Sequence, residues 1–297
     1  MDTPKRCLVV VRAGDQSLHP QWTSDPAARA WDLVVSYFGK DPDRFRGPGK
    51  RRIDDKGQKY AGLLALLTRE DFWREYDYIW LPDDDLAAEQ STIENLFESM
   101  ARLDLALAQP ALSWTSYFSH PVTLRHPSFR LRMTNFIEIM APCFHRPFLE
   151  TCLPTFGENM SGWGLDWVWP RMLLPDRQRC AIIDNVVVTH TRPIGGPTYD
   201  RLRAAGITPR AEGEALLRRF GIPLGKVPEV FAALDADGNL LEQSRSDDCA
   251  RIDALRARDW AAFGAFRRQR EREAAERFAS LRRPIYASEP IRWRLRP

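Results

Sequence analysis

The chain has 297 residues, of which 44% are hydrophobic and 28% charged, and its formal charge is +3. This length allows one large domain or two small ones, and the composition argues against global disorder. The small net charge gives no reason to expect nucleic acid or anionic lipid as the main partner. Local patches matter more than the total, because arginines are concentrated in the stretch 251–283.

Five cysteines are spread along the chain without a Cys-x-x-Cys pair, at Cys7, Cys143, Cys152, Cys180 and Cys249. The odd count and the wide spacing argue against a disulfide scaffold or a structural zinc site and favour free thiols in a reducing compartment. The apolar run near the N-terminus is too short for a signal-peptide core or a membrane span. We therefore expect a cytoplasmic protein without a transmembrane segment and leave a peripheral membrane association open.

The first part of the chain alternates candidate strands and helices. Cys7–Val11 is a continuous apolar run of the kind buried in a parallel sheet, and Trp31–Phe38 is a second strand candidate. A loop rich in Gly, Pro, Lys and Arg spans 45–57 and leads to a helix candidate at Lys59–Thr68. Tyr76–Leu81 is the third strand candidate, and it is ended by a proline.

A helix is expected to begin at Ser91. Ser91 and Glu94 have the spacing of a capping box, in which the two side chains satisfy free backbone N–H groups of the first turn. The apolar residues that follow recur at helical spacing, at Ile93, Leu96, Phe97 and Met100.

The middle of the chain continues the alternation. Strands are expected at Leu105–Ala108, Phe136–Met140 and Cys180–Val188, and helices at Pro147–Leu153 and Leu165–Leu173. Strands that alternate with helices predict an α/β fold whose sheet is at least partly parallel.

The last part of the chain has a different character. Asp235–Asn239 has the composition of a turn between two short extended segments, and Ser246–Arg283 is helix-forming with a broken apolar stripe. We therefore expect a main domain over residues 1–225 and a mainly helical C-terminal extension over 226–297, packed on that domain.

Three adjacent aspartates, Asp83, Asp84 and Asp85, follow the third strand. Ligands of parallel sheets bind beyond the carboxyl ends of the strands, and the triplet lies at such an end. Neighbouring carboxylates repel one another, and a divalent cation relieves that repulsion. Mg²⁺ and Mn²⁺ favour oxygen ligands and usually share them with substrate phosphates. The triplet alone is as well explained by an acidic turn before a helix.

A second motif spans 162–167 and reads Gly-Trp-Gly-Leu-Asp-Trp. Gly164 permits a close approach of the backbone to a ligand, and Trp163 offers a face that suits a sugar ring. Asp166 could remove a proton from an acceptor hydroxyl. The alternative is a tryptophan-lined core turn in which Asp166 caps the next helix.

His190 follows the last strand of this series. A neutral imidazole at that position could complete the shell of a bound cation. A lone histidine after a strand is more often structural, so this assignment depends on the aspartates and on Asp166.

The order strand-Asp-x-Asp, Gly-Trp-Gly-x-Asp, strand-x-His resembles that of GT-A glycosyltransferases, including the β-1,4-galactosyltransferases. A closer resemblance is to a plant and bacterial family known as lysine-ketoglutarate reductase trans-splicing related proteins. It extends over roughly residues 7–196. The matching segments are Ser17–Trp22, Tyr76–Trp80, Asp83–Leu86, Gln109–Pro110, Phe136–Pro142, Gly162–Asp166 and Asp184–His190.

The resemblance implies a GT-A-like fold, which is a mixed sheet flanked by helices, and a metal-dependent sugar transfer. The donor would be a nucleoside-diphosphate sugar, the acceptor a hydroxyl of a carbohydrate, lipid or protein, and the cofactor Mn²⁺ or Mg²⁺. Asp83, Asp85 and His190 would hold the metal, with Asp83 also near the ribose, and Asp166 would be the base. The third carboxylate, Asp84, leaves open which aspartates of the triplet bind the metal.

Further residues would contact the substrates if the resemblance holds. Among them are three residues of the two motifs, Asp84, Trp163 and Gly164. Lys59, or alternatively Lys56, would contact the diphosphate. Arg192 would reach phosphate from a mobile lid at 191–197, although a plain surface loop explains this segment equally well.

Glu138 interrupts an otherwise apolar segment, where an unpaired carboxylate is costly. It would face the acceptor or pair with Arg125, Arg130 or Arg132.

The same residues are compatible with two other functions. The same carboxylates and His190 would suit a hydrolase acting on a phosphoester or a sugar phosphate. Alternatively, the chain is a non-catalytic binding module whose basic helix at 251–283 engages RNA or a membrane surface.

Overall fold

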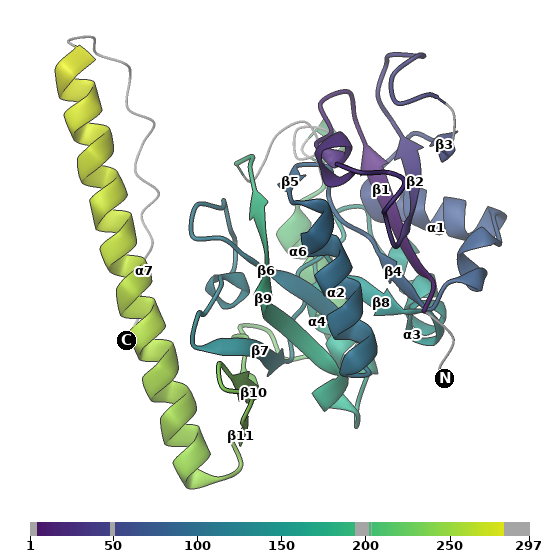
Figure 1. The fold of residues 1–297 in the computed structure, drawn as a ribbon. Helices are drawn as coiled ribbons and strands as arrows, with labels where there is room; N and C mark the ends of the chain where they lie inside the picture. Colours follow the sequence, from purple (N-terminus) through teal and green to yellow (C-terminus); the bar gives the residue numbers. More distant parts are fainter. Residues whose placement is uncertain (1–4, 48–50, 194–201, 203, 282–297) are drawn as a thin grey trace.

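One mixed β-sheet runs through the computed structural model, which describes residues 5–47, 51–193, 202 and 204–281 (Figure 1). Its strands are β1 (Cys7–Ala13), β2 (Asp32–Tyr37), β3 (Arg51–Asp54), β4 (Tyr78–Trp80), β5 (Leu86–Ala87), β6 (Leu107–Leu112), β7 (Phe129–Thr134), β8 (Cys143–His145), β9 (Cys180–His190), β10 (Val230–Asp235) and β11 (Leu240–Glu242). Their order is β11-β10-β7-β9-β6-β8-β4-β1-β2-β3, and β5 pairs with β9 outside this path.

The sheet has two parallel blocks joined by an antiparallel strand. β4, β1, β2 and β3 pair in parallel, as do β6 and β9, and β8 lies antiparallel between β4 and β6. β7, β10 and β11 continue the sheet with antiparallel pairing. The predicted α/β class, with a sheet that is partly parallel, is confirmed.

Helices cover both faces of this sheet. They are α1 (Lys59–Arg69), α2 (Gln90–Arg102), α3 (Arg146–Cys152), α4 (Leu165–Met172), α6 (Pro209–Arg219) and α7 (Ser246–Leu281). The apolar residues of α2 pack in one core, with Phe263 of α7, whereas those of α1, α3, α4 and α6 pack in the other. Strand β1 serves both cores, since Val9 and Val11 face the first and Leu8 and Val10 face the second.

Three predicted elements differ from the structure. Helix α2 begins at Gln90 with Glu89 as its N-cap residue and no side-chain cap, so the capping box predicted at Ser91 is wrong. The segment Phe136–Met140 is an irregular, buried stretch, and the strand precedes it as β7. The predicted loop at 45–57 contains β3, which is fixed by parallel pairing with β2.

The C-terminal part adds to the sheet before it becomes helical. β10 and β11 form a hairpin around the predicted turn, and β10 pairs with β7, so the segment after residue 225 supplies two strands of the sheet. Helix α7 then runs as a long helix beside the body of the molecule (Figure 1). Asp259 of α7 links the helix to the sheet domain, because its carboxylate accepts hydrogen bonds from the backbone N–H (2.9 Å) and the hydroxyl (2.5 Å) of Ser128.

All five cysteines are free thiols, as expected, and four of them are buried. Among the described residues, no helix combines the length and the apolar character needed to cross a membrane.

Candidate functional site

The three aspartates lie directly beyond β4, at the carboxyl edge of the parallel strands. The backbone N–H groups of Leu81 and Asp83 donate to the carbonyls of Pro142 (2.9 Å) and Met140 (2.7 Å). These bonds hold the triplet against the segment that contains Glu138. Each of the three carboxylates then has a different partner, which gives each a different electrostatic environment.

Asp83 forms an ion pair with Lys59, with Oδ1 at 2.8 Å from Nζ. The ammonium group also donates to the carbonyls of Ile139 (2.7 Å) and Met140 (3.1 Å). Burial raises the pKa of Asp83 and lowers that of Lys59, in each case against the attraction of the partner. Lys59 therefore neutralises Asp83 from within the protein.

Asp84 connects the triplet to the turn after β1. Its Oδ2 accepts a hydrogen bond from the backbone N–H of Gly14 at 2.7 Å, and its Oδ1 lies 3.5 Å from the guanidinium of Arg192. Arg192 also donates to the carbonyl of Gln16. Burial raises the pKa of Asp84 to about 6 despite these contacts. Of the segment predicted as a lid, 194–197 lies outside the described residues.

Asp85 has one carboxylate oxygen that faces His190 and one that has no partner. Its Oδ2 lies 3.4 Å from Nε2 of His190, and its Oδ1 is buried without a hydrogen bond to any described residue. The pairing of β5 with β9, in which Leu86 lies opposite His190, brings the two residues together. A buried acceptor without a donor is costly, so this oxygen marks a place where a cation or a proton donor would be stabilised.

His190 is the last residue of β9, and the loop after β6 holds it on two sides. Its Nδ1 lies 2.8 Å from the carbonyl oxygen of Tyr117, and its backbone N–H donates to Oγ of Ser116 at 3.1 Å. Because a carbonyl can only accept, Nδ1 carries the proton that joins the pair. Burial lowers the pKa of His190, but the hydrogen bond and charge of Asp85 outweigh it and leave the pKa raised.

The glycine-tryptophan motif forms the start of α4. Gly164 is its N-cap residue at φ 97°, and a Cβ there would lie 3.2 Å from the carbonyl oxygen of Gly213. Asp166 is therefore in the first turn and is not the N-cap, and its Oδ1 accepts from the N–H of Trp167 at 3.0 Å. Burial raises the pKa of Asp166 to about 7. The side chain of Trp163 is partly exposed, with the residue at 38%.

Glu138 is buried with an unpartnered carboxylate oxygen. Its Oε2 has no hydrogen-bond partner among the described residues, although its backbone N–H donates to Oε1 of Gln109 at 2.7 Å. Burial, followed by the charge of Asp166, raises the pKa of Glu138 to about 8. The two residues are close in the fold, because the N–H of Ile137 donates to the carbonyl of Asp166 at 3.2 Å.

The arginine partners expected for Glu138 are engaged elsewhere or lie apart from it. Arg132 forms a fully buried ion pair with Asp184, with Nε at 2.8 Å from Oδ2. Arg130 donates from Nε to the carbonyl of Ala236. Arg125 forms no ion pair with a described residue. The prediction of an arginine pair for Glu138 is therefore wrong.

The spacing of Asp85 and His190 is compatible with one divalent cation shared between them. Within the described part of the chain, no group of three or more His, Cys, Asp and Glu side chains is placed to hold a metal ion by itself. Asp85 and His190 offer an oxygen and a nitrogen 3.4 Å apart. Two ligands that each lie about 2.0–2.2 Å from one ion are roughly 3 Å or more apart, so this separation is compatible with a shared ion.

The loop 113–118 is the part of the site that sequence reasoning missed. It follows β6, which ends beside β9 at the same edge of the sheet, and Oγ of Ser113 lies 2.8 Å from Oγ1 of Thr189. The same rule that singled out Asp83 and His190, that ligands bind beyond strand ends, would have found it. The predicted strand stopped at Ala108, whereas β6 continues to Leu112 and so moves the strand end to this loop.

No protein-family model matches this chain, and a search of curated proteins gives no match. Among solved structures, it is similar to glucosyl-3-phosphoglycerate synthase from Mycobacterium tuberculosis in complex with Mn²⁺, UDP-glucose and phosphoglyceric acid, at 16% identity, a TM-score of 0.45, and coverage of 74% of this chain and 82% of that one. The same synthase with Mg²⁺ and UDP gives 15% identity, a TM-score of 0.46, and coverage of 74% and 81%. At these values the likeness assigns no role to any residue of the site.

Proposed function

We propose that the protein is a metal-dependent glycosyltransferase that moves a sugar from a nucleoside-diphosphate sugar to an acceptor hydroxyl. The observation that carries the proposal is the state of Asp85, whose Oδ1 is buried without a partner while its Oδ2 faces Nε2 of His190. This arrangement stands at the carboxyl edge of the parallel strands, where α/β folds bind their ligands.

Asp85 and His190 would hold a divalent cation, Mn²⁺ or Mg²⁺. When bound, such a cation supplies positive charge that stabilises the leaving nucleoside diphosphate. The Tyr117 carbonyl keeps the Nδ1 side of His190 occupied and directs Nε2 toward Asp85, and partners of this kind orient metal-binding histidines in other proteins. The proposal depends on Asp85 and His190 and not on which of the other two aspartates also contacts the metal.

Asp83 and Asp84 would contact the donor. Lys59 pairs with Oδ1 of Asp83 from the protein side, so that the other carboxylate oxygen can accept a hydrogen bond from a ribose hydroxyl. In this proposal Lys59 positions Asp83, whereas the contact expected from the sequence was with the diphosphate. Arg192, which lies beside Asp84, is the cationic group that would meet the diphosphate.

Asp166 would act as the base toward the acceptor. A carboxylate whose pKa is about 7 is suited to take a proton near neutral pH. In the step proposed, the acceptor oxygen bonds to the anomeric carbon, its proton passes to Asp166, and the bond to the diphosphate oxygen breaks. The unpartnered Oε2 of Glu138 would accept a hydrogen bond from an acceptor hydroxyl, and Trp163 with Gly164 would border the acceptor.

The long basic helix gives less support to the binding-module alternative. Several arginines of α7 lie beside acids of the same helix, as in Arg267–Glu271 and Arg270–Glu273. Such interleaved charges are typical of a solvated helix surface. The hydrolase alternative shares the site residues, and it differs in its products.

Titration calorimetry of UDP, GDP, ADP and CDP with and without Mn²⁺ tests the proposal. We expect Mn²⁺-dependent binding of at least one nucleotide and its loss in Asp85→Asn, because that substitution removes the anionic ligand. Asp237→Asn, in an exposed turn, is the matched control and should bind like the wild type. No binding of any nucleotide would contradict the transferase, whereas release of phosphate from a phosphoester or a sugar phosphate without any acceptor would favour the hydrolase.

A further inference from the structure

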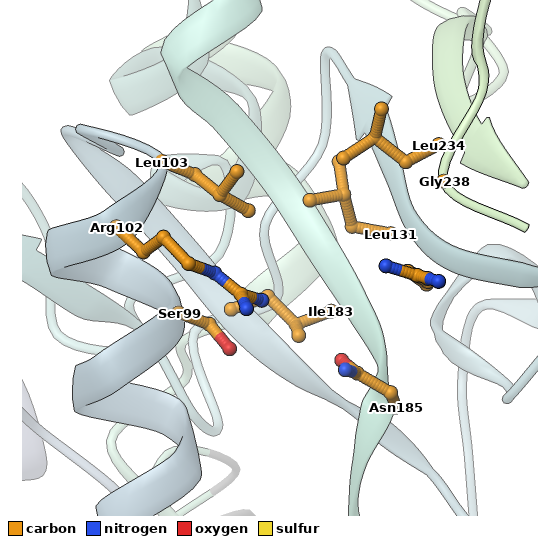
Figure 2. A pocket seen from close by; sticks show the side chains of 9 residues that line it. Ser99, Arg102, Leu103, Leu131, Ile183, Asn185, Leu234 and Gly238 are labelled. Carbon is orange, nitrogen blue, oxygen red and sulfur yellow. The ribbon is translucent and has the colours of Figure 1, made fainter. Parts of the chain in front are cut away.

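A cavity of about 250 Å³ lies away from the candidate site, at the C-terminal end of α2 (Figure 2). Residues of α2, β7, β9 and β10 line it, and it lies over the sheet near the β10–β11 turn. On β9, Asn185 lines the cavity and His190 belongs to the candidate site. The two residues are five positions apart along β9, which corresponds to at most roughly 16 Å.

The cavity combines an apolar floor with cationic and neutral polar groups. Leu131 and Ile183 form part of the floor, and Arg102 and Arg130 bring two guanidinium groups. Figure 2 shows Ser99 and Arg102 projecting from α2 toward Ile183, with Asn185 beyond them. No Asp or Glu is among the described residues that line it, so the two positive charges have no counterion there.

Several of these polar groups lack partners in the described part of the chain. Ser99 is only 5% exposed, and its hydroxyl makes no hydrogen bond, although serines in helices can bond the preceding turn. Arg102 and Asn185 make no ion pair and no side-chain hydrogen bond with described residues. The Ser99 hydroxyl and the exposed guanidinium groups of Arg102 and Arg130 therefore offer several hydrogen-bond donors along one side of the cavity.

Arg130 is fixed in position by the β10–β11 turn. Its Nε donates to the carbonyl of Ala236 at 3.1 Å, which leaves its terminal nitrogens to face the cavity. A Cβ at Gly238 would lie 3.2 Å from one of these nitrogens, so the glycine leaves room for the guanidinium against the turn. A positioned guanidinium loses less conformational freedom when it binds an anion than a free arginine does.

Asn185 reaches the cavity through an irregularity of β9. Ile183 of β9 pairs with Pro110 of β6, but the next residue of β6, Ala111, pairs with Val187. The three residues of β9 between Ile183 and Val187 therefore form a bulge. Within this bulge Asp184 turns inward to its ion pair with Arg132, and Asn185 is exposed on the cavity side. Bulges of this kind redirect side chains and are frequent beside binding sites.

We propose that this cavity binds a small organic oxyanion, a phosphate or a carboxylate attached to an apolar group. The anionic oxygens would accept hydrogen bonds from Arg102, Arg130 and Ser99, and the apolar group would lie on Leu131 and Ile183. Arginine favours such planar, two-pronged contact with phosphate and carboxylate. The volume equals that of about eight water molecules at ~30 Å³ each, so the ligand is one small molecule.

Binding of phenyl phosphate, benzoate and phenol to the full chain, followed by two-dimensional NMR, tests this site. We expect the two anions to shift signals of residues around the cavity, and we expect phenol, which has the ring without the charge, to bind at least about tenfold more weakly. The stronger of phenyl phosphate and benzoate identifies the preferred oxyanion. Arg102→Gln and Arg130→Gln should each weaken anion binding about tenfold.

Arg268→Gln, on the exposed surface of α7, is the matched control and should bind the anions like the wild type. Unchanged melting temperatures of the three variants would show that lost binding does not come from unfolding. The proposal is overturned if phenol binds as tightly as the anions, if the shifted signals lie elsewhere, or if the Gln variants bind like the control. Because no nucleotide or metal is involved, the outcome does not depend on the transferase proposal.

Discussion

The imidazole of His190 is held by the backbone carbonyl of Tyr117, whose oxygen lies 2.8 Å from Nδ1. The backbone N–H of Tyr117 in turn donates to the carbonyl of His190 at 3.0 Å, so the two residues are joined by main-chain and side-chain bonds. The orientation of His190 toward Asp85 therefore depends on the loop 113–118. That loop is supported from outside by α7, because Trp114 packs against Phe263 and Phe266 with ring centroids 6.0 and 5.7 Å apart.

Replacing Phe263 by alanine should disturb the site from a distance. The loss of a buried phenyl ring costs about 3–5 kcal/mol of unfolding free energy, and it also releases the loop that orients His190. If the proposed function holds, Mn²⁺-dependent nucleotide binding should weaken about three- to tenfold. This effect is smaller than the one expected from removing a group that contacts a metal ligand directly. Ile252→Ala, on the same helix but packed against β7 and β10, should lower stability comparably and leave binding unchanged. Equal weakening in both variants would contradict the link through the loop.

The same glycine-to-alanine change should have opposite effects in two helices. In α1, a Cβ at Gly62 would lie 2.5 Å from the guanidinium carbon of Arg12. Arg12 is buried and bound to Asp55 and Ser36, so it cannot easily move. We expect Gly62→Ala to lower the free energy of unfolding by about 1–3 kcal/mol.

In α7, a Cβ at Gly264 meets no atom of the described residues closer than 3.4 Å. Gly264→Ala should therefore raise the free energy of unfolding by about 0.5–1 kcal/mol through helix propensity. Urea unfolding measures both changes. A Gly62→Ala variant as stable as the wild type would show that Arg12 is free to move.

Glu138→Gln should make the protein more stable at alkaline pH. The pKa of Glu138 is raised from 4.5 to about 8 in the folded state, so the folded chain holds this proton after the unfolded chain has lost it. Its contribution to stability is fully present below pH 4.5 and is lost as the pH rises toward 8, by up to ~1.4 kcal/mol per pH unit. The neutral glutamine removes that loss.

Urea unfolding at pH 5.5 and pH 8.5 gives the readout for this variant. The stability gain of Glu138→Gln over the wild type should be larger at the higher pH. Glu271→Gln, on the exposed surface of α7, should show no such difference. A gain that is independent of pH would mean that Glu138 is ionised in the folded protein.

Asp184→Asn should be among the most destabilising single changes outside the candidate site. The substitution leaves the guanidinium of Arg132, which is fully buried, without its counterion, and unpaired buried charges cost about 3–5 kcal/mol. Glu150→Gln, which removes the partner of Arg74 at the surface, should cost less than about 1 kcal/mol. The comparison of the two variants by urea unfolding separates a buried from an exposed ion pair. Similar small losses in both would contradict the assigned role of Asp184.

The sequence predicted the elements whose pattern is local. The apolar run of β1, the apolar stripe of α2 and the run that becomes β9 each indicate their own structure. Strand β3 has no such pattern, since it reads Arg-Arg-Ile-Asp and depends on pairing with β2. The segment Phe136–Met140 has the apolar pattern of a strand, but distant groups satisfy its backbone in place of a neighbouring strand. The side chain of Gln109 accepts a hydrogen bond from the N–H of Glu138, and the carbonyl of Asp166 accepts one from the N–H of Ile137.

The candidate site was predictable by residue type but not by partner. Strand ends and motif order singled out Asp83, Asp85 and His190, and the structure places Asp85 against His190. The pairing of Asp83 with Lys59 depends on how α1 packs against the triplet, and no local pattern specifies it. The same holds for Tyr117, whose role is carried by its backbone and is therefore independent of its side chain.

The two outermost strands of the sheet bear on how copies of this chain meet. An open edge exposes unpaired N–H and C=O groups to which a strand of another molecule can add. At one edge, β3 carries Arg51, Arg52 and Asp54, and at the other, β11 has only three residues and leads directly into α7. Charged side chains and short edge strands both disfavour such addition. Both edges of the described sheet thus carry features that disfavour the addition of a strand from a second copy of the chain.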